Sequence, residues 1–301
     1  MELYIVDAFT QVTFGGNPAG VVLLDEGTDF PSEEIMIKTA AELRYSETAF
    51  VKKTGEDEFN IRYFTPAAEV ELCGHATIAS FWVLKEKGLC RPGKIYLNRT
   101  LSGDIYIEVR EDFIMMDMAT PSDLGNIDTE EALEELYEVL GAKYEKVLVH
   151  KSPVEHIELL PKIVSTGLPD IMVPIVDFNA LMNLAPNFEA LSELSKKYEV
   201  VGVHAFAIDE DDPDYTAHTR NFAPLYDIDE EAATGTSSGA LSYYLYELGL
   251  VKENEKIKFL QGESMKRPSN IVCNIAKEET GTLKIRVGGC GVTLAKGHIF
   301  I

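Results

Sequence analysis

Two short segments place glycine and hydroxyl residues where a loop enters a helix. They are Cys73-Gly74-His75-Ala76-Thr77 and Thr234-Gly235-Thr236-Ser237-Ser238-Gly239. The first turn of a helix has backbone N–H groups without intrahelical partners, and the helix dipole favours negative charge there. Both segments therefore predict a site for a carboxylate or a similar anion. The alternative is that Thr234, Thr236 and Ser237 only cap their helix.

Glu47 and His75 are the candidates for acid–base chemistry. Glu47 lies among small and apolar neighbours in Ser46-Glu47-Thr48-Ala49-Phe50-Val51. Shielding from water would help it hold a proton, so that it could act as acid and base in turn. The alternative is a solvent-facing Glu at a strand edge. His75 is a candidate because of its position at a helix start, since a lone His is more often a packed residue.

An internal repeat organises the elements that must position these residues. Arg62-Tyr63-Phe64-Thr65-Pro66 recurs as Arg220-Asn221-Phe222-Ala223-Pro224, 158 positions later (220 − 62). A helical pattern follows each glycine turn, over 79–89 and 241–250. Two glycine pairs share an offset of 161, namely Gly74 with Gly235 and Gly88 with Gly249. Short strand-like segments surround both helices, so we expect an α+β fold in which each lobe wraps a curved sheet around a central helix.

The repeat also predicts two lobes with the active site in a cleft between them. Residues 1–118 form the N-terminal lobe and residues 119–287 the C-terminal lobe. Pro121-Ser122-Asp123-Leu124-Gly125 resembles a linker, and Asp128-Thr129-Glu130-Glu131 a helix start after it. The last strand-like segment, 288–301, could return to either lobe, and we place it with the N-terminal one.

Composition excludes several classes of partner. The chain of 301 residues has 50 acidic and 27 basic residues, for a net charge of −23, which disfavours nucleic acid and anionic membrane surfaces. The N-terminus does not resemble a signal peptide and no apolar run approaches about 20 residues, so we expect a cytoplasmic protein.

The spacing of potential ligand residues predicts neither a metal nor an organic cofactor. The four cysteines form no C-x-x-C pair and the six histidines no zinc motif. No G-x-G-x-x-G or G-K-[ST] loop is present for a nucleotide.

As a set, several motifs resemble those of the phenazine-biosynthesis PhzF family. In chain order they are Asp7-Ala8-Phe9-Thr10, Gly16-Asn17-Pro18-Ala19-Gly20-Val21-Val22, Ser46-Glu47-Thr48-Ala49-Phe50, Phe64-Thr65-Pro66, Gly74-His75-Ala76-Thr77, Phe222-Ala223-Pro224 and Ala233-Thr234-Gly235-Thr236. The resemblance spans nearly the whole chain. It implies a diaminopimelate-epimerase-like fold of two pseudo-symmetric lobes, a homodimer and a cofactor-free isomerase.

The resemblance also implies roles for individual residues. Glu47 would move a proton between carbons of a small carboxylate or cyclic amino-acid-like substrate, assisted by His75 and by an acid before the second turn. That acid is Glu231, where the family usually has Asp followed by Pro, and this chain reads Glu230-Glu231-Ala232. The implied substrate-binding residues are Asn17, Ser46, Gly74, Ala76, Gly235 and Thr236.

Two alternatives to this isomerase remain. One is an amino-acid racemase or epimerase with a thiol on each face of the substrate. Cys73 fits the first thiol, but its repeat partner is Thr234, which does not supply a thiolate. The other is a member of the fold that binds small molecules without catalysis.

Overall fold

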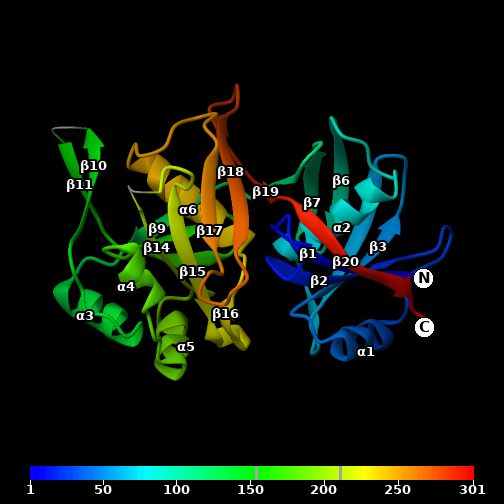
Figure 1. Cartoon of the computed structure of the whole chain (residues 1–301), viewed down its shortest axis with the longest axis horizontal. Coiled ribbons are helices and arrows are strands. Elements are labelled where there is room, and N and C mark those ends of the chain that lie inside the picture. The colour runs from blue at the N-terminus through cyan, green and yellow to red at the C-terminus, as the bar shows by residue number, and fades with distance from the viewer. Residues whose placement is uncertain (153–154, 210–211) are drawn as a thin grey trace. The chain divides into compact units, whose positions relative to one another are not determined.

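Two compact units make up the computed structural model, which describes residues 1–152, 155–209 and 212–301. Unit 1 contains Met1–Asp117 together with Gly288–Ile301, and unit 2 contains Met118–Val287. Both ends of the chain therefore belong to unit 1, where the last strand, red in Figure 1, lies alongside the first, blue.

Unit 1 has nine strands and two helices among its described residues. They are β1 (Glu2–Ala8), β2 (Asn17–Leu23), α1 (Glu33–Leu43), β3 (Thr48–Lys53), β4 (Glu58–Phe64), β5 (Glu69–Val70), α2 (Gly74–Glu86), β6 (Lys94–Thr100), β7 (Gly103–Val109), β8 (Ile114–Asp117) and β20 (Gly291–His298). One further strand, β19 (Leu283–Gly289), crosses the boundary between the two units.

The described part of unit 2 opens with a strand and a helix and then follows the order of unit 1. Its elements are β9 (Ser122–Asn126), α3 (Glu130–Val139), β10 (Val147–Ser152), β11 (Glu155–Leu159), β12 (Lys162–Ser165), β13 (Pro169–Pro174), α4 (Phe178–Met182), α5 (Phe188–Lys197), β14 (Gly202–Ala207), β15 (Ala217–Ala223), the 3-10 helix η1 (Pro224–Tyr226), β16 (Ile228–Glu231), α6 (Gly235–Glu247), β17 (Ile257–Gln261) and β18 (Ser269–Lys277).

Strand pairing confirms the pseudo-symmetric fold. In unit 1, β2 and β3 are parallel, β3 and β4 antiparallel, β4 and β6 parallel, and β6 and β7 antiparallel. Strands β13, β14, β15, β17 and β18 of unit 2 repeat that order and those directions. Helix α2 precedes β6 and helix α6 precedes β17, as the sequence repeat requires.

The two repeated helices form the centre of their units. Nine of the 13 residues are buried in α2 and nine of 13 in α6. Phe81 of α2 packs edge-on against Phe59 at 5.6 Å, and Tyr244 of α6 against Phe206 at 5.7 Å. Both helices are followed by a glycine with φ of 72°, Gly88 and Gly249, which is the left-handed conformation that ends a helix.

The structure also differs from expectation in several elements. The segment Pro121–Gly125 is not a linker, because β9 forms there and pairs antiparallel with β12. Helices α1, α4 and α5 were not expected, and they connect strands that run parallel. Among the described residues, none of the helices combines the length and apolar character needed to cross a bilayer.

Removing the aromatic core of unit 1 should destabilise the protein. Phe81 is completely buried, so Phe81→Ala should lower the free energy of unfolding by about 3–5 kcal/mol through lost contacts and the remaining cavity. Tyr106→Ala is the control, since this aromatic residue is 53% exposed and its loss should cost less than about 0.5 kcal/mol. Urea denaturation measures both values, and equal losses would contradict the central position of α2.

Candidate active site

His75 is the most connected side chain at the start of α2. Its ring is 3% exposed. Asn17 Nδ2 lies 3.2 Å from Nδ1, and Ser46 Oγ lies 3.3 Å from Nε2. Cys73, the residue before α2, places its Sγ 3.4 Å from Nδ1. Three loops that are distant in sequence therefore meet at one imidazole.

A tight backbone approach positions Asn17 at the first residue of β2. The preceding residue, Gly16, has φ of 61°, and a Cβ there would overlap the carbonyl oxygen of Ala8. Only glycine suits both requirements. The chain can then turn directly into β2, which brings the buried amide of Asn17 to His75.

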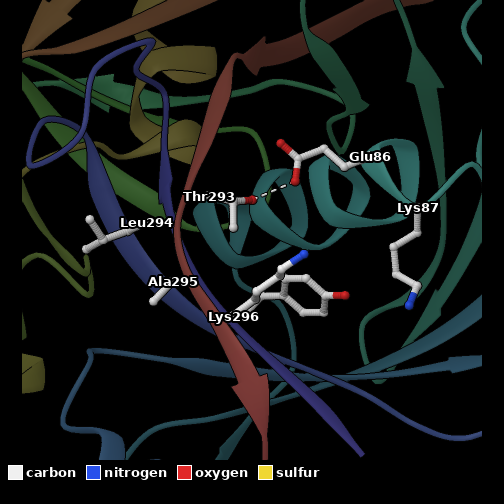
Figure 2. A pocket seen from close by; sticks show the side chains of 7 residues that line it. Glu86, Lys87, Thr293, Leu294, Ala295 and Lys296 are labelled. Atoms are coloured by element: carbon white, nitrogen blue, oxygen red, sulfur yellow. Dashed lines mark hydrogen bonds between the residues drawn. The ribbon is translucent and has the colours of Figure 1, made fainter.

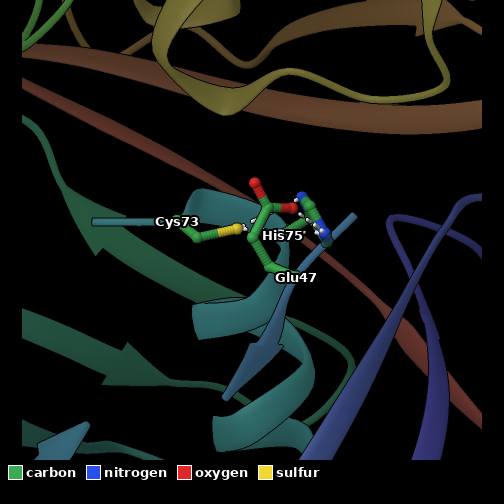
Figure 3. A group of neighbouring side chains, drawn as sticks. All are labelled: Glu47, Cys73 and His75. Carbon is green, nitrogen blue, oxygen red and sulfur yellow. Dashed lines mark hydrogen bonds and ion pairs between the residues drawn. The ribbon is translucent and has the colours of Figure 1, made fainter. Parts of the chain in front are cut away.

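Glu47 reaches the same ring from the other side. It directly precedes β3, and its Oε2 lies 3.3 Å from His75 Nε2, with the side chain 12% exposed. Figure 3 shows the side chains of Glu47, Cys73 and His75 turned toward one another. The contact with His75 lacks hydrogen-bond geometry, and Oε2 is buried without a hydrogen-bond partner among the described residues.

The protonation state of His75 follows from its surroundings. Burial lowers the pKa of the imidazole, and the negative charge of Glu47 opposes this effect only in part. The ring is therefore neutral near pH 7. With Asn17 Nδ2 as a donor, Nδ1 accepts, so the single ring proton lies on Nε2 and faces Ser46 and Glu47.

The structure thus brings together most of the site residues that the sequence indicated for the first lobe. Asn17, Ser46 and Glu47 each contact His75, and Gly74 and Ala76 lie beside His75 in the first turn of α2. Cys73 was considered from the sequence only as a candidate racemase thiol, and its contact with the His75 ring was not anticipated.

Glu231, Gly235 and Thr236 belong to unit 2. Glu231 ends β16, where its Oε2 accepts a hydrogen bond from Thr234 Oγ1 at 2.9 Å. Gln261 joins them, because its Nε2 donates to the Glu231 carbonyl and its Oε1 accepts from the Thr234 N–H. Gly235 and Thr236 form the first turn of α6. The Thr234 hydroxyl therefore donates to the Glu231 carboxylate and does not cap α6.

The helices α2 and α6 differ from the others at their N-termini. Ser32, Thr129, Asp177 and Asn187 cap α1, α3, α4 and α5 with a side-chain oxygen. Among the described helices of the α type, only α2 and α6 have an N-cap residue whose side chain makes no such bond. The alternative that Thr234 only caps its helix is thus wrong, and both first turns remain able to bind an anion.

A buried acid beneath α6 was not anticipated from the sequence. Asp170 is completely buried and accepts a hydrogen bond from Ser237 Oγ. Asn221 Nδ2 in turn donates to Ser237 Oγ at 3.2 Å. Burial raises the pKa of Asp170 to about 7, although the bonds from Ser237 and the Gly202 backbone oppose this.

A surface pocket of about 440 Å³ lies elsewhere in unit 1 (Figure 2). Its lining residues are Tyr4, Glu86, Lys87, Thr293, Leu294, Ala295 and Lys296. Glu86 is the last residue of α2 and His75 is in its first turn. At 1.5 Å per residue, about 16 Å separate them, so this pocket is not part of the His75 site.

The sequence is similar to those of known proteins over nearly its whole length. The family model described as phenazine biosynthesis-like protein matches residues 6–297. An uncharacterized isomerase of Clostridium acetobutylicum is 30% identical and aligns over 100% of this chain and 98% of its own length.

Solved structures show the same fold. A phenazine biosynthesis protein of the PhzF family from Bacillus anthracis superposes with a TM-score of 0.85 at 26% identity, over 100% of this chain and 99% of its own. A probable proline racemase from Agrobacterium radiobacter has a TM-score of 0.63 at 13% identity, over 100% and 93%, a likeness of fold alone. The expected diaminopimelate-epimerase-like architecture is confirmed.

Replacing Asp170 by Asn should remove a pH-dependent loss of stability. The folded protein holds this proton up to about pH 7, whereas the ordinary pKa of 3.8 applies to the unfolded chain. The free energy of unfolding therefore falls as pH rises between these values, because the unfolded chain binds fewer protons there. At about 1.4 kcal/mol per pKa unit, the free energy of unfolding of the wild type should fall by up to about 4 kcal/mol as the pH rises from 3.8 to about 7. The Asp170→Asn variant should not show this decrease.

Urea denaturation at about pH 5 and about pH 8 measures the difference, which should appear mainly at the higher pH. Asp229→Asn replaces an exposed acid of unit 2 and should have the same free energy of unfolding as the wild type at both pH values. If the free energy of unfolding of Asp170→Asn depended on pH as that of the wild type does, Asp170 would not be protonated in the folded protein.

Proposed function

This chain is an isomerase of the phenazine biosynthesis-like protein family, and from that premise we propose that Glu47 moves a proton on a small carboxylate substrate without a cofactor. The reaction removes a proton from a substrate carbon and returns it at another position. A cyclic amino-acid-like compound is the substrate class that the family resemblance suggests. The same resemblance extends the proposal to a cytoplasmic homodimer.

The state of the Glu47 carboxylate is the observation that carries this proposal. Its Oε2 is buried and has no hydrogen-bond donor among the described residues, although a neutral imidazole lies 3.3 Å away. Because this oxygen accepts no hydrogen bond from the described residues, it remains available to accept a proton from a substrate carbon. Glu47 thus has the shielding that the extraction of a proton from carbon requires.

The proposed proton transfer needs one base, and only one of the two repeated units has a carboxylate at the position of Glu47. Thr48 of β3 pairs with Gly20, and the corresponding pair in unit 2 is Gly202 of β14 with Asp170. The residue before β14 is Val201, in the place that Glu47 occupies before β3. A single carboxylate therefore takes the proton and gives it back, and the product differs from the substrate in the position of one hydrogen.

The neighbours of Glu47 support the charge changes of the substrate. As the proton leaves carbon, negative charge develops on the adjoining carbonyl or carboxylate, and preorganised donors stabilise it. His75 Nε2–H, the Ser46 hydroxyl and the amides of the first turn of α2 are such donors.

A two-thiol racemase is the second candidate, because Cys73 lies beside His75. The corresponding N-cap of α6 is Thr234, and its hydroxyl is bonded to Glu231. Burial raises the pKa of Cys90 to about 12 and also raises that of Cys273, so neither thiol ionises readily. These contacts favour the carboxylate over a pair of thiols.

Exchange of carbon-bound hydrogen in deuterated water tests the proposal. The protein is incubated with a panel of small cyclic amino acids and unsaturated carboxylic acids, and mass spectrometry detects deuterium in the recovered compounds. Glu47→Gln should slow the exchange by about 10²–10⁴-fold, the usual contribution of a general acid–base group, while substrate binding persists.

Glu56→Gln is the matched control, since it removes an exposed glutamate from the same unit and should exchange at the wild-type rate. Undiminished exchange in Glu47→Gln would assign the proton to another group. If Cys73→Ser alone abolished exchange, the thiol mechanism would replace the one proposed here.

A further inference from the structure

We propose that Gln261 is a positioning residue, which directs the hydroxyl proton of Thr234 to the carboxylate of Glu231 and thereby holds that carboxylate in place for the reaction. The proposal rests on the proposed function and on the assisting role that the family resemblance implies for Glu231. Gln261 acts through the other two side chains, and all three residues belong to unit 2.

The side chain of Gln261 is completely buried at the end of β17, and its amide is bonded at both ends. Nε2 donates to the Glu231 carbonyl oxygen at 2.7 Å and to Thr234 Oγ1 at 3.1 Å. Oε1 accepts the backbone N–H of Thr234 at 3.1 Å. The opposite orientation of the amide would set its oxygen against a carbonyl oxygen and its NH₂ group against an N–H donor. The network therefore fixes which end of the amide carries the donors.

The direction of the Thr234 hydroxyl follows from this orientation. A hydroxyl group has a single proton and accepts with its lone pairs. Because Gln261 Nε2 donates to this oxygen, the proton points away from the amide, and Glu231 Oε2 accepts it at 2.9 Å. Hydrogen bonds to an ionised group are stronger than neutral ones, and consecutive bonds polarise one another. Without the amide, the hydroxyl could rotate away from the carboxylate.

The backbone around Glu231 is held by separate contacts. Nε and Nη2 of Arg220 each donate to one carboxylate oxygen of the preceding residue, Glu230, at 2.8 Å. The turn after β17 begins at Gly262, which has φ of 81°, and a Cβ there would lie 2.7 Å from the carbonyl oxygen of Ala232. Only glycine allows this approach. With the backbone held, hydrogen bonds to the carboxylate select the rotamer of Glu231.

The position of this carboxylate matters because an acid–base group must lie within hydrogen-bond reach of the proton that it exchanges. A displacement of about 1 Å can cost about 10²-fold in rate. An interaction that acts only in the transition state lowers kcat when it is lost and leaves KM nearly unchanged. We therefore expect the loss of Gln261 to appear in kcat.

Paired variants test the route through the hydroxyl. Gln261→Met removes the amide without adding charge, and Thr234→Val removes the hydroxyl but keeps the backbone N–H. Each should lower kcat for deuterium exchange by about 10²-fold with little change in KM. The double variant should lose no more than either single variant, because both changes break the same connection. Losses that multiply in the double variant would overturn the proposal.

Three further variants serve as controls, and urea denaturation defines conditions in which every variant is folded. Thr234→Ser keeps a hydroxyl and should exchange at least about 10-fold faster than Thr234→Val, since the lost connection costs about 10²-fold. Gln11→Met removes an exposed glutamine of unit 1 and should match the wild type. Glu231→Gln should lose at least as much as Gln261→Met. Wild-type exchange in Glu231→Gln would overturn the proposal and leave the role of Glu47 intact.

Crystal structures test the positioning without a substrate. In the wild type, Glu231 Oε2 should lie within hydrogen-bond distance of Thr234 Oγ1, whereas in Gln261→Met the Glu231 side chain should adopt another rotamer or several. A Glu231 carboxylate that stays bonded to Thr234 in the variant would overturn the proposal. A wild type that exchanges deuterium with none of the compounds would contradict the proposed function instead, and the crystal structures would still decide whether Gln261 positions Glu231.

Discussion

Helices α2 and α6 are mostly buried in their own units, and the polar groups at their N-termini govern the structure around them. The first-turn N–H groups of α2 and α6 have no intrahelical acceptor. Neither N-cap residue, Cys73 or Thr234, accepts a hydrogen bond from these groups through its side chain. Polar side chains therefore enter the core beneath each helix start. The Tyr63 hydroxyl lies 2.6 Å from Thr77 Oγ1 in unit 1, and Ser237 binds Asp170 in unit 2.

The same constraint explains why the candidate chemistry lies where it does. A buried polar group is costly unless it is bonded, so the loops that reach these helix starts carry residues that bond to one another. Asn17 and Ser46 meet His75 for this reason. Glu47 is an exception at the start of α2, with one buried oxygen that finds no donor among the described residues.

Much of the fold could be predicted from the sequence, because repeated glycines and helical patterns are local signals. Strand β9 could not, since all five of its residues are exposed and only the pairing with β12 defines it. In the site, residue type and resemblance indicated Glu47 and His75. The burial of Asp170 depends on strands and a helix far apart in sequence, so no local pattern identifies it. The contact of Glu231 with Thr234 likewise required coordinates.

The pairing of β1 with β20 has a consequence for the order in which the protein is made. Residues 2–8 are translated long before their partner, residues 291–298. Unit 2 is a continuous segment, Met118–Val287, and can form its contacts before unit 1 is complete. Domains usually fold from the N-terminus during synthesis. In this chain unit 1 begins before unit 2 but is completed after it, and one edge of β1 stays unpaired until β20 has been translated.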